Sequence, residues 1–371
     1  MTLASAEARL SELPGLLLLV PAAIAQRGNV FGALGSRLGT AIHTGEFSLT
    51  RRLDTVFGQN VLASMTLSVV AATWLALVGW LLAQIFGVND AMGILDFIAV
   101  SVVGGTIASL VVLAITVALA GGSTRFGWDL DNVTAPLVTG VGDLVTLPAL
   151  LLGSLVVGPS SVSEIVGGLS VLLAVGALII SIRTALGLLR RIVIESLPVL
   201  ALASTLSLVA GIVVEKQLSS FLDEPALLIL IPAYFGMAGA LGGILSSRLG
   251  TKVHLGLIEP SRIPQRQALL DIRSVAVLAL PIFALVGLAA HVGSQIVAVE
   301  SPGLGSMVAV AAIAGIGATL VVIAVAYYGT LSAVRFGLDP DTATIPLTNS
   351  VLDLVGAFTL VGTILLLGIG S

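Results

Sequence analysis

The sequence predicts an all-α integral membrane protein with about ten transmembrane helices, arranged as two parallel pseudo-symmetric repeats around a central pore. The chain of 371 residues is 57% hydrophobic and 10% charged, whereas a soluble domain carries about 25% charged residues. Several nearly uncharged stretches exceed the ~20 residues that cross a bilayer as a helix. Two segments also repeat each other at a spacing of 210 residues, and each places an aspartate inside an apolar helix.

Hydropathy divides the chain into ten apolar segments that we expect to be the transmembrane helices. They are residues 13–43, 57–87, 94–121, 131–157, 164–187, 192–215, 225–255, 270–297, 304–334 and 341–370. Several are longer than the bilayer requires, so we expect them to tilt, break or extend beyond it. The apolar runs do not alternate with a period of two, which argues against a β-barrel.

Composition excludes several other classes of protein and site. The chain has no cysteine, which rules out disulfides and thiolate metal sites. The net charge is −4 without a basic stripe, so we expect no nucleic-acid partner. The start of the chain mixes Glu7 and Arg9 and does not resemble a cleaved signal peptide. The expected location is the cell membrane, with the lipid bilayer as partner.

Basic residues follow alternate segments, which predicts the orientation of the chain. Cytoplasmic loops carry an excess of Lys and Arg, so we place both termini outside. The residues expected on the cytoplasmic side are Arg37, Arg51, Arg52, Arg125, Arg183, Arg190, Arg191, Arg248, Lys252, Arg262, Arg266, Arg273 and Arg335.

The first four segments match the last four at offsets of 210 or 211 residues. Pro21 pairs with Pro232, and His43 pairs with His254. The two copies share one topology, so they are parallel repeats about an axis along the membrane normal. We therefore expect a first repeat at 1–160 that lacks its first helix, a connecting helix at 161–190 and a second repeat at 191–371. For the two histidines, interfacial packing is favoured over metal ligation or pH sensing.

A lone aspartate lies near the middle of the last helix of each repeat. Asp143 lies twelve residues beyond Asp131, and Asp353 lies twelve beyond Asp341, which places each central acid ~18 Å into its helix. An ionised carboxylate in hydrocarbon costs several kcal/mol unless it meets water, a cation or a partner. We expect no arginine at that depth. The alternative is that each acid is protonated or bonds to a neighbouring helix.

Polar and small residues share a helix face with these acids. Thr139 lies on the face of Asp143, and Asn349 lies on the face of Asp353. Two carboxylates with hydroxyl and amide oxygens suit a hard cation such as Mg²⁺, which usually keeps several of its waters. The pattern predicts a two-carboxylate cation site built by both repeats.

Further acids mark the expected cytoplasmic ends of the same two helices. Asp129 with Asp131, and Asp339 with Asp341, either cap the helices or form a second acidic ring at the mouth of the pore. We expect them to belong to the cation path.

Segment one contains a polar stretch, Gln26-Arg27-Gly28-Asn29. It predicts either a helix break near the pore, with Asn29 offering an amide oxygen, or a tolerated kink. Glu195 is a further candidate for the pore or a side cavity, and Asp96 is not, because its counterpart in the second repeat is Ser306.

A short motif also occurs in intramembrane aspartyl proteases, but it is weaker evidence than the repeated aspartates. Residues 140–143 spell Gly-Val-Gly-Asp, and Pro-Ala-Leu follows at 148–150. The proteases need a second aspartate in a Tyr-Asp pair on the preceding helix, whereas here the second central acid is Asp353. We treat the protease as a remote alternative.

Several motifs together resemble the MgtE-type magnesium transporters, in the doubled form typified by solute carrier family 41. The matching residues are Asp129-Leu130-Asp131-Asn132, Pro136 and Gly142-Asp143 in the first repeat, Asp339-Pro340-Asp341, Pro346 and Asp353 in the second, and Gly28-Asn29 with Ser36-Arg37-Leu38-Gly39-Thr40. The resemblance implies a divalent-cation pore between two five-helix units, with Asp143 and Asp353 as central ligands. The cytoplasmic regulatory domains of bacterial MgtE proteins have no counterpart in this sequence.

Residues and resemblance together predict a transporter or channel for Mg²⁺, with Mn²⁺ and Co²⁺ as further candidate ions, and no enzyme activity. A sodium-coupled Mg²⁺ exchanger of the same fold and a transporter of another substrate remain alternatives. One chain holds both repeats, so we expect a working monomer, with a dimer as the alternative.

Overall fold

The computed structural model describes residues 12–50, 52–88, 91–128, 130–158, 162–216, 224–254, 256–259, 261–335 and 340–369. These residues form ten helices long and apolar enough to cross a membrane, and they contain no strand. The helices are α2 (Leu16–His43), α3 (Val56–Ile85), α4 (Ile94–Phe126), α5 (Leu130–Ser154), α6 (Val162–Arg183), α7 (Gly187–Glu215), α9 (Ala226–His254), α10 (Arg266–Val297), α11 (Leu304–Arg335) and α12 (Pro340–Leu366). The predicted all-α membrane fold and its ten helices are confirmed.

The chain divides into two compact units, Met1–Thr205 and Leu206–Ser371. The division falls inside α7. Leu200, from the first part of this helix, is buried in the hydrophobic core of the first unit, whereas Ala210 is buried in the core of the second. The helix that sequence analysis assigns to the second repeat alone therefore packs its early residues in the first unit.

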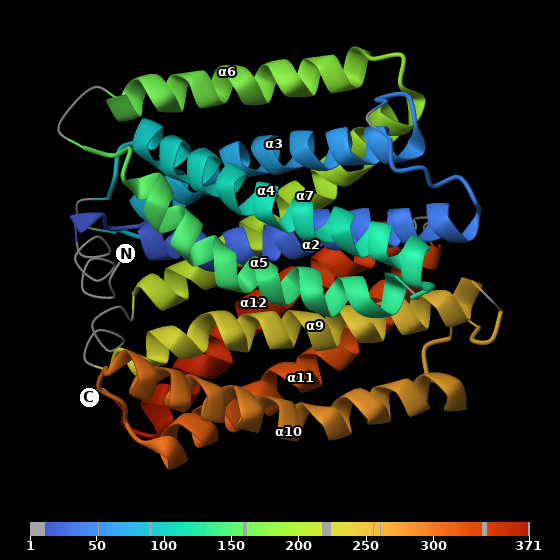
Figure 1. Ribbon diagram of the computed structural model, residues 1–371. Coiled ribbons are helices and arrows are strands. Elements are labelled where there is room, and N and C mark those ends of the chain that lie inside the picture. Colours follow the sequence, from blue (N-terminus) through green and yellow to red (C-terminus); the bar gives the residue numbers. More distant parts are fainter. Residues whose placement is uncertain are drawn as a thin grey trace. The chain divides into compact units, whose positions relative to one another are not determined.

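The first unit is built around α2, which packs against α3, α4 and α5. In its most apolar stretch 78% of α2 is buried, against 22% of α6. Helix α6 lies alongside α3 and α4 (Figure 1), and Gly167 brings it onto α4. A Cβ added at Gly167 would stand 2.5 Å from the carbonyl oxygen of Leu95. The rest of α6 exposes large apolar side chains such as Leu172 and Ile180, as expected of a surface solvated by lipid.

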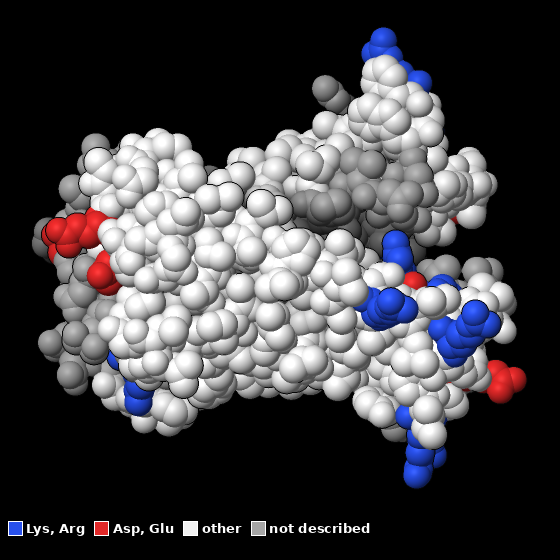
Figure 2. Space-filling model, turned by 90° about the horizontal axis from the view of Figure 1, so that it is seen from below, with Lys and Arg blue, Asp and Glu red and all other residues white. Residues whose placement is uncertain are grey.

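The second unit repeats this plan with α9 in the place of α2. Helix α9 packs against α10, α11 and α12. Its core is more aromatic than that of the first unit, with Tyr234, Phe235 and Phe283 all buried. On the face drawn in Figure 2, the charged side chains gather toward the left and right of the view and a broad uncharged region lies between them, which is the surface that a bilayer requires.

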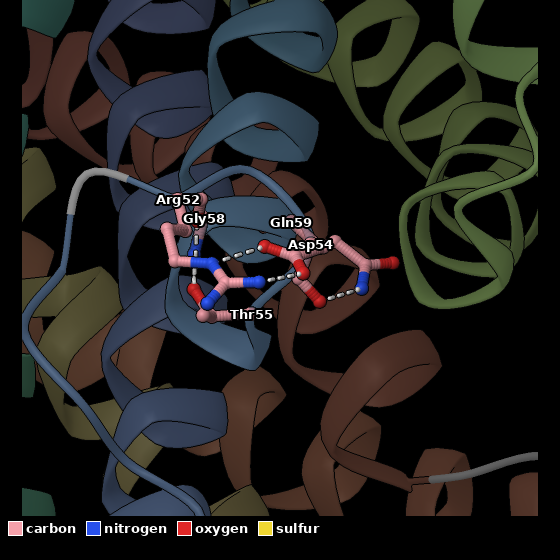
Figure 3. Close-up of polar contacts among 5 residues, drawn as sticks. All are labelled: Arg52, Asp54, Thr55, Gly58 and Gln59. Carbon is pink, nitrogen blue, oxygen red and sulfur yellow. Dashed lines mark hydrogen bonds and ion pairs between the residues drawn. The ribbon is translucent and has the colours of Figure 1, made fainter.

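A polar cluster fixes the start of α3 (Figure 3). The side chain of Thr55 accepts a hydrogen bond from the backbone N–H of Gly58 at 3.1 Å, which satisfies one of the free donors of the first turn. Arg52 donates to both carboxylate oxygens of Asp54, at 3.2 and 2.9 Å. This contact lowers the pKa of Asp54 below its ordinary value, with the hydrogen bond from Arg52 as the largest cause.

Candidate functional site

Asp143 lies near the middle of α5 and is buried, with 8% of its surface exposed. In the described part of the chain, no hydrogen bond or ion pair reaches its carboxylate. The alternative in which the acid bonds to a neighbouring helix therefore finds no support among these residues. An ionised carboxylate buried without a partner is costly, so the interpretations that remain for Asp143 are a protonated acid and an ion ligand.

Asp353 occupies the matching position in α12 and is 5% exposed. It bonds to a neighbouring helix, which is the alternative that the sequence left open, although the partner residue was not predicted. The hydroxyl of Ser207, on α7, donates to Oδ2 of Asp353 at 2.5 Å. Ser207 is fully buried. The central acids of the two repeats therefore have different surroundings, although their sequence positions correspond.

A polar residue one turn before each aspartate meets a glycine of the unit's most central helix. A Cβ added at Gly28 of α2 would stand 3.9 Å from Oγ1 of Thr139, and one added at Gly239 of α9 would stand 3.8 Å from Oδ1 of Asn349. Both polar side chains are partly buried. Each unit thus brings a hydroxyl or amide oxygen close to a glycine of its most central helix.

One of the two interpretations of the polar stretch in α2 is excluded, and the expectation that no arginine lies at the depth of Asp143 is wrong. The helix runs without a break from Leu16 to His43, which excludes the break and leaves the alternative of a polar stretch that the helix tolerates. Asn29 is buried. An arginine does lie at the depth of Asp143. The guanidinium-bearing residue Arg27 is 2% exposed, and a Cβ added at Gly142 would stand 3.4 Å from the Cβ of Arg27.

The structure gives no support to an ion-binding role for the remaining candidate acids. Asp129 and Asp339 lie outside the described residues, as do the side chains of Asp131 and Asp341. Glu195 forms an exposed ion pair with Arg191 at 2.8 Å, which gives no support to a role in a pore. No group of three or more His, Cys, Asp or Glu side chains suited to a metal occurs among the residues that could be searched.

The family model for MgtE, described as a divalent cation transporter, matches residues 20–153 and 231–363. The chain belongs to the MgtE family. The two matches begin 211 residues apart, which confirms the internal repeat, and Asp143 and Asp353 lie within them. Membership of this family favours a membrane transporter over the intramembrane protease.

The chain is also similar to members of solute carrier family 41. The chain is 28% identical to solute carrier family 41 member 2 of Xenopus laevis over 266 residues, which is 68% of this chain and 46% of the relative. The human member 2 is also 28% identical, over 67% of this chain and 44% of the relative. Member 3 of Rattus norvegicus is 24% identical, over 66% and 53%. This MgtE-family chain therefore spans about half the length of these relatives. No solved structure matches it.

Proposed function

We propose that this protein carries a divalent cation, Mg²⁺, across the cell membrane, and that Asp143 and Asp353 both bind the ion during transport. The observation that carries the proposal is the pair of buried carboxylates at matching positions of two repeats. A carboxylate in an apolar helix is retained when it serves an ion path. Membership of a family described as divalent cation transporters supports the choice of ion.

The oxygen donors around the two acids suit a hard, partly hydrated cation. Thr139 and Asn349 each add an oxygen one turn from the carboxylate, and Asn29 adds a buried amide on α2. Mg²⁺ usually keeps several waters and takes one or two carboxylates, so such a set is sufficient. The same chemistry accommodates Mn²⁺ or Co²⁺. The four acids Asp129, Asp131, Asp339 and Asp341 would collect or release ions at the cytoplasmic mouth.

The membrane potential gives the direction of passive flow. With a negative interior, the inward step of a dication is favoured by about 4–5 kcal/mol per 100 mV. A channel or uniporter therefore needs no second substrate for uptake. Sodium-coupled exchange could use the same two carboxylates, so the two mechanisms differ in their driving force and not in their ligands.

The central test replaces each acid by its amide. We expect Asp143→Asn and Asp353→Asn each to lower Mg²⁺ flux into proteoliposomes at least tenfold, because the ion loses a charged ligand. Thermal unfolding should stay close to that of the wild type, since an amide is less costly to bury than a charge. Asp54→Asn, which changes an exposed acid outside the helices, is the control for flux: it should keep the wild-type flux although it melts below the wild type at neutral pH. Wild-type flux in both central variants would place the ion site elsewhere.

The driving force is tested by removing sodium. A channel or uniporter should carry Mg²⁺ at full rate in sodium-free proteoliposomes when a voltage is applied, and the current should follow the voltage. Flux that appears only with an opposing sodium gradient would instead identify an exchanger. Cleavage of membrane peptides that is lost in Asp143→Asn while ion flux persists would identify the protease.

A further inference from the structure

Arg27 is a buried charged residue that the proposed ion site does not use. It is 2% exposed in the middle of α2. Its Nη1 donates to the carbonyl oxygen of Ala23 at 2.6 Å and to Oε1 of Gln26 at 3.3 Å. Its Nε has no hydrogen-bond partner, and no carboxylate within the described residues forms an ion pair with it. Burial of an uncompensated cation is expensive, so packing alone is a weak reason for its presence.

The second repeat fills the corresponding space with an uncharged side chain. In the first unit the guanidinium fills a notch on α4, where a Cβ added at Gly105 would stand 2.5 Å from Nη2 of Arg27 and 3.4 Å from the Cβ of Ala72. The counterpart of Gly105 is Gly315, and its notch is filled by the ring of Phe283.

In the two repeats, the large side chain that fills this notch comes from different helices. Sequence offsets of 211 pair Arg27 with Ala238, and Ala72 with Phe283. A long cation beside an alanine in one unit thus corresponds to an alanine and an apolar ring in the other. All four side chains are buried. An uncharged side chain can therefore fill this notch in the same fold, but in the first unit a charged one fills it.

The position of Arg27 relative to Asp143 suggests what the charge does. The Cβ of Arg27 lies against Gly142, the residue next to the central acid of the same unit. The positive charge belongs to the first repeat only, whereas both repeats carry the aspartate. A fixed cation in this low-dielectric region opposes the binding of a mobile cation nearby.

We propose that Arg27 keeps a positive charge buried in the same unit as Asp143, and that this charge weakens ion binding so that a divalent cation can leave. Its side chain begins against Gly142, next to the acid, and ends in the notch at Gly105 of α4. This inference rests on the proposed function, because it takes Asp143 as an ion ligand. The two halves of the transporter then differ in charge: the unit of Asp143 contains the buried Arg27, whereas Asp353 accepts a hydrogen bond from Ser207.

The experiment separates charge from shape. Arg27→Met keeps much of the apolar stem and removes the charge, and Arg27→Lys keeps the charge with a different head group. The double variant Arg27→Ala with Ala72→Phe reproduces the neutral packing of the second repeat. We expect the KM for Mg²⁺ flux into proteoliposomes to fall about tenfold or more in both neutral variants, and to stay within about twofold of the wild type in Arg27→Lys.

Two results would overturn the inference. One is an unchanged KM in the folded double variant. The other is an equal loss of maximal flux in Arg27→Met and Arg27→Lys that the double variant restores, because this pattern belongs to a residue that only fills space. Thermal unfolding of each variant identifies any that fails to fold. Asp143→Asn is measured alongside: wild-type flux in that variant rejects the ion site itself, whereas lost flux there with an unchanged KM in the Arg27 variants rejects only the role of Arg27.

Discussion

Arg37 of α2 donates from Nε to Oδ1 of Asn60 on α3, at 2.7 Å. The second repeat keeps this contact and adds charge to it. Its counterpart of Asn60 is Asp271, which lies 2.5 Å from Nζ of Lys252 and 3.6 Å from Nη1 of Arg248. Asn60 and Asp271 are both buried. Each unit therefore joins its most central helix to the next helix through a buried polar acceptor, which is an amide in the first unit and a carboxylate in the second.

Asp271 is predicted to be important for the stability of the second unit. Asp271→Ala takes the carboxylate from Lys252, which is only 23% exposed and keeps only the carbonyl oxygen of Gln267, and we expect a loss of roughly 2–3 kcal/mol. Asp271→Asn copies the residue of the first unit and should lose less, because the amide oxygen still accepts a hydrogen bond. Thermal unfolding in detergent measures both. Equal melting temperatures for wild type and Asp271→Ala would show that the contact contributes nothing.

Adjacent glycines of α6 offer a matched pair for testing its contact with α4. A Cβ at Gly167 would press on the backbone of Leu95, whereas nothing lies within 4 Å of a Cβ at Gly168. We expect Gly167→Ala to cost about 1–3 kcal/mol through forced separation of the helices. Gly168→Ala should be neutral or slightly stabilising, since alanine favours helix. Thermal unfolding of the two variants decides, and identical behaviour would contradict the close approach.

Hydropathy and repeat spacing were sufficient to predict much of this molecule. Ten apolar segments and the burial of Asp143 and Asp353 follow from the cost of exposing polar groups to lipid and from the rise of a helix. The sequence placed Arg27 inside segment one but did not match its depth to that of Asp143, because the offset between two helices is set by their packing. The burial of Arg27 depends on a notch at Gly105, a residue far from it in the sequence.

The partner of Asp353 could not be predicted for a related reason. Ser207 lies on α7, which is apolar on most of its surface, and such a helix gives no pattern that fixes its rotation. Which residue of α7 faces α12 is decided by tertiary packing. An offset comparison of the repeats could have identified the replacement of Asn60 by Asp271, because both positions lie in clearly matched segments.

The cluster before α3 should give part of the protein's stability a dependence on pH. The pKa of Asp54 is lowered in the folded protein by Arg52, so its contribution is present above the ordinary value of 3.8 and is lost as the pH falls through the folded-state pKa. Asp54→Asn should therefore melt below the wild type at neutral pH and approach it in acid. Thr55→Ala, which removes the cap, should cost about 1 kcal/mol at every pH. Parallel melting curves for wild type and Asp54→Asn across this range would contradict the contact.

Ser207 should affect ion binding through the carboxylate that it contacts. Ser207→Ala removes the hydroxyl that donates to Oδ2 of Asp353, so the carboxylate loses a group that holds its orientation. If Asp353 is an ion ligand, the KM for Mg²⁺ should rise about threefold to tenfold, as expected when a group that orients a metal ligand is removed. Ser204→Ala is the control, because Ser204 is a buried serine one turn earlier on α7. An unchanged KM in Ser207→Ala, or an equal rise in Ser204→Ala, would show that the hydrogen bond serves packing and not the ion.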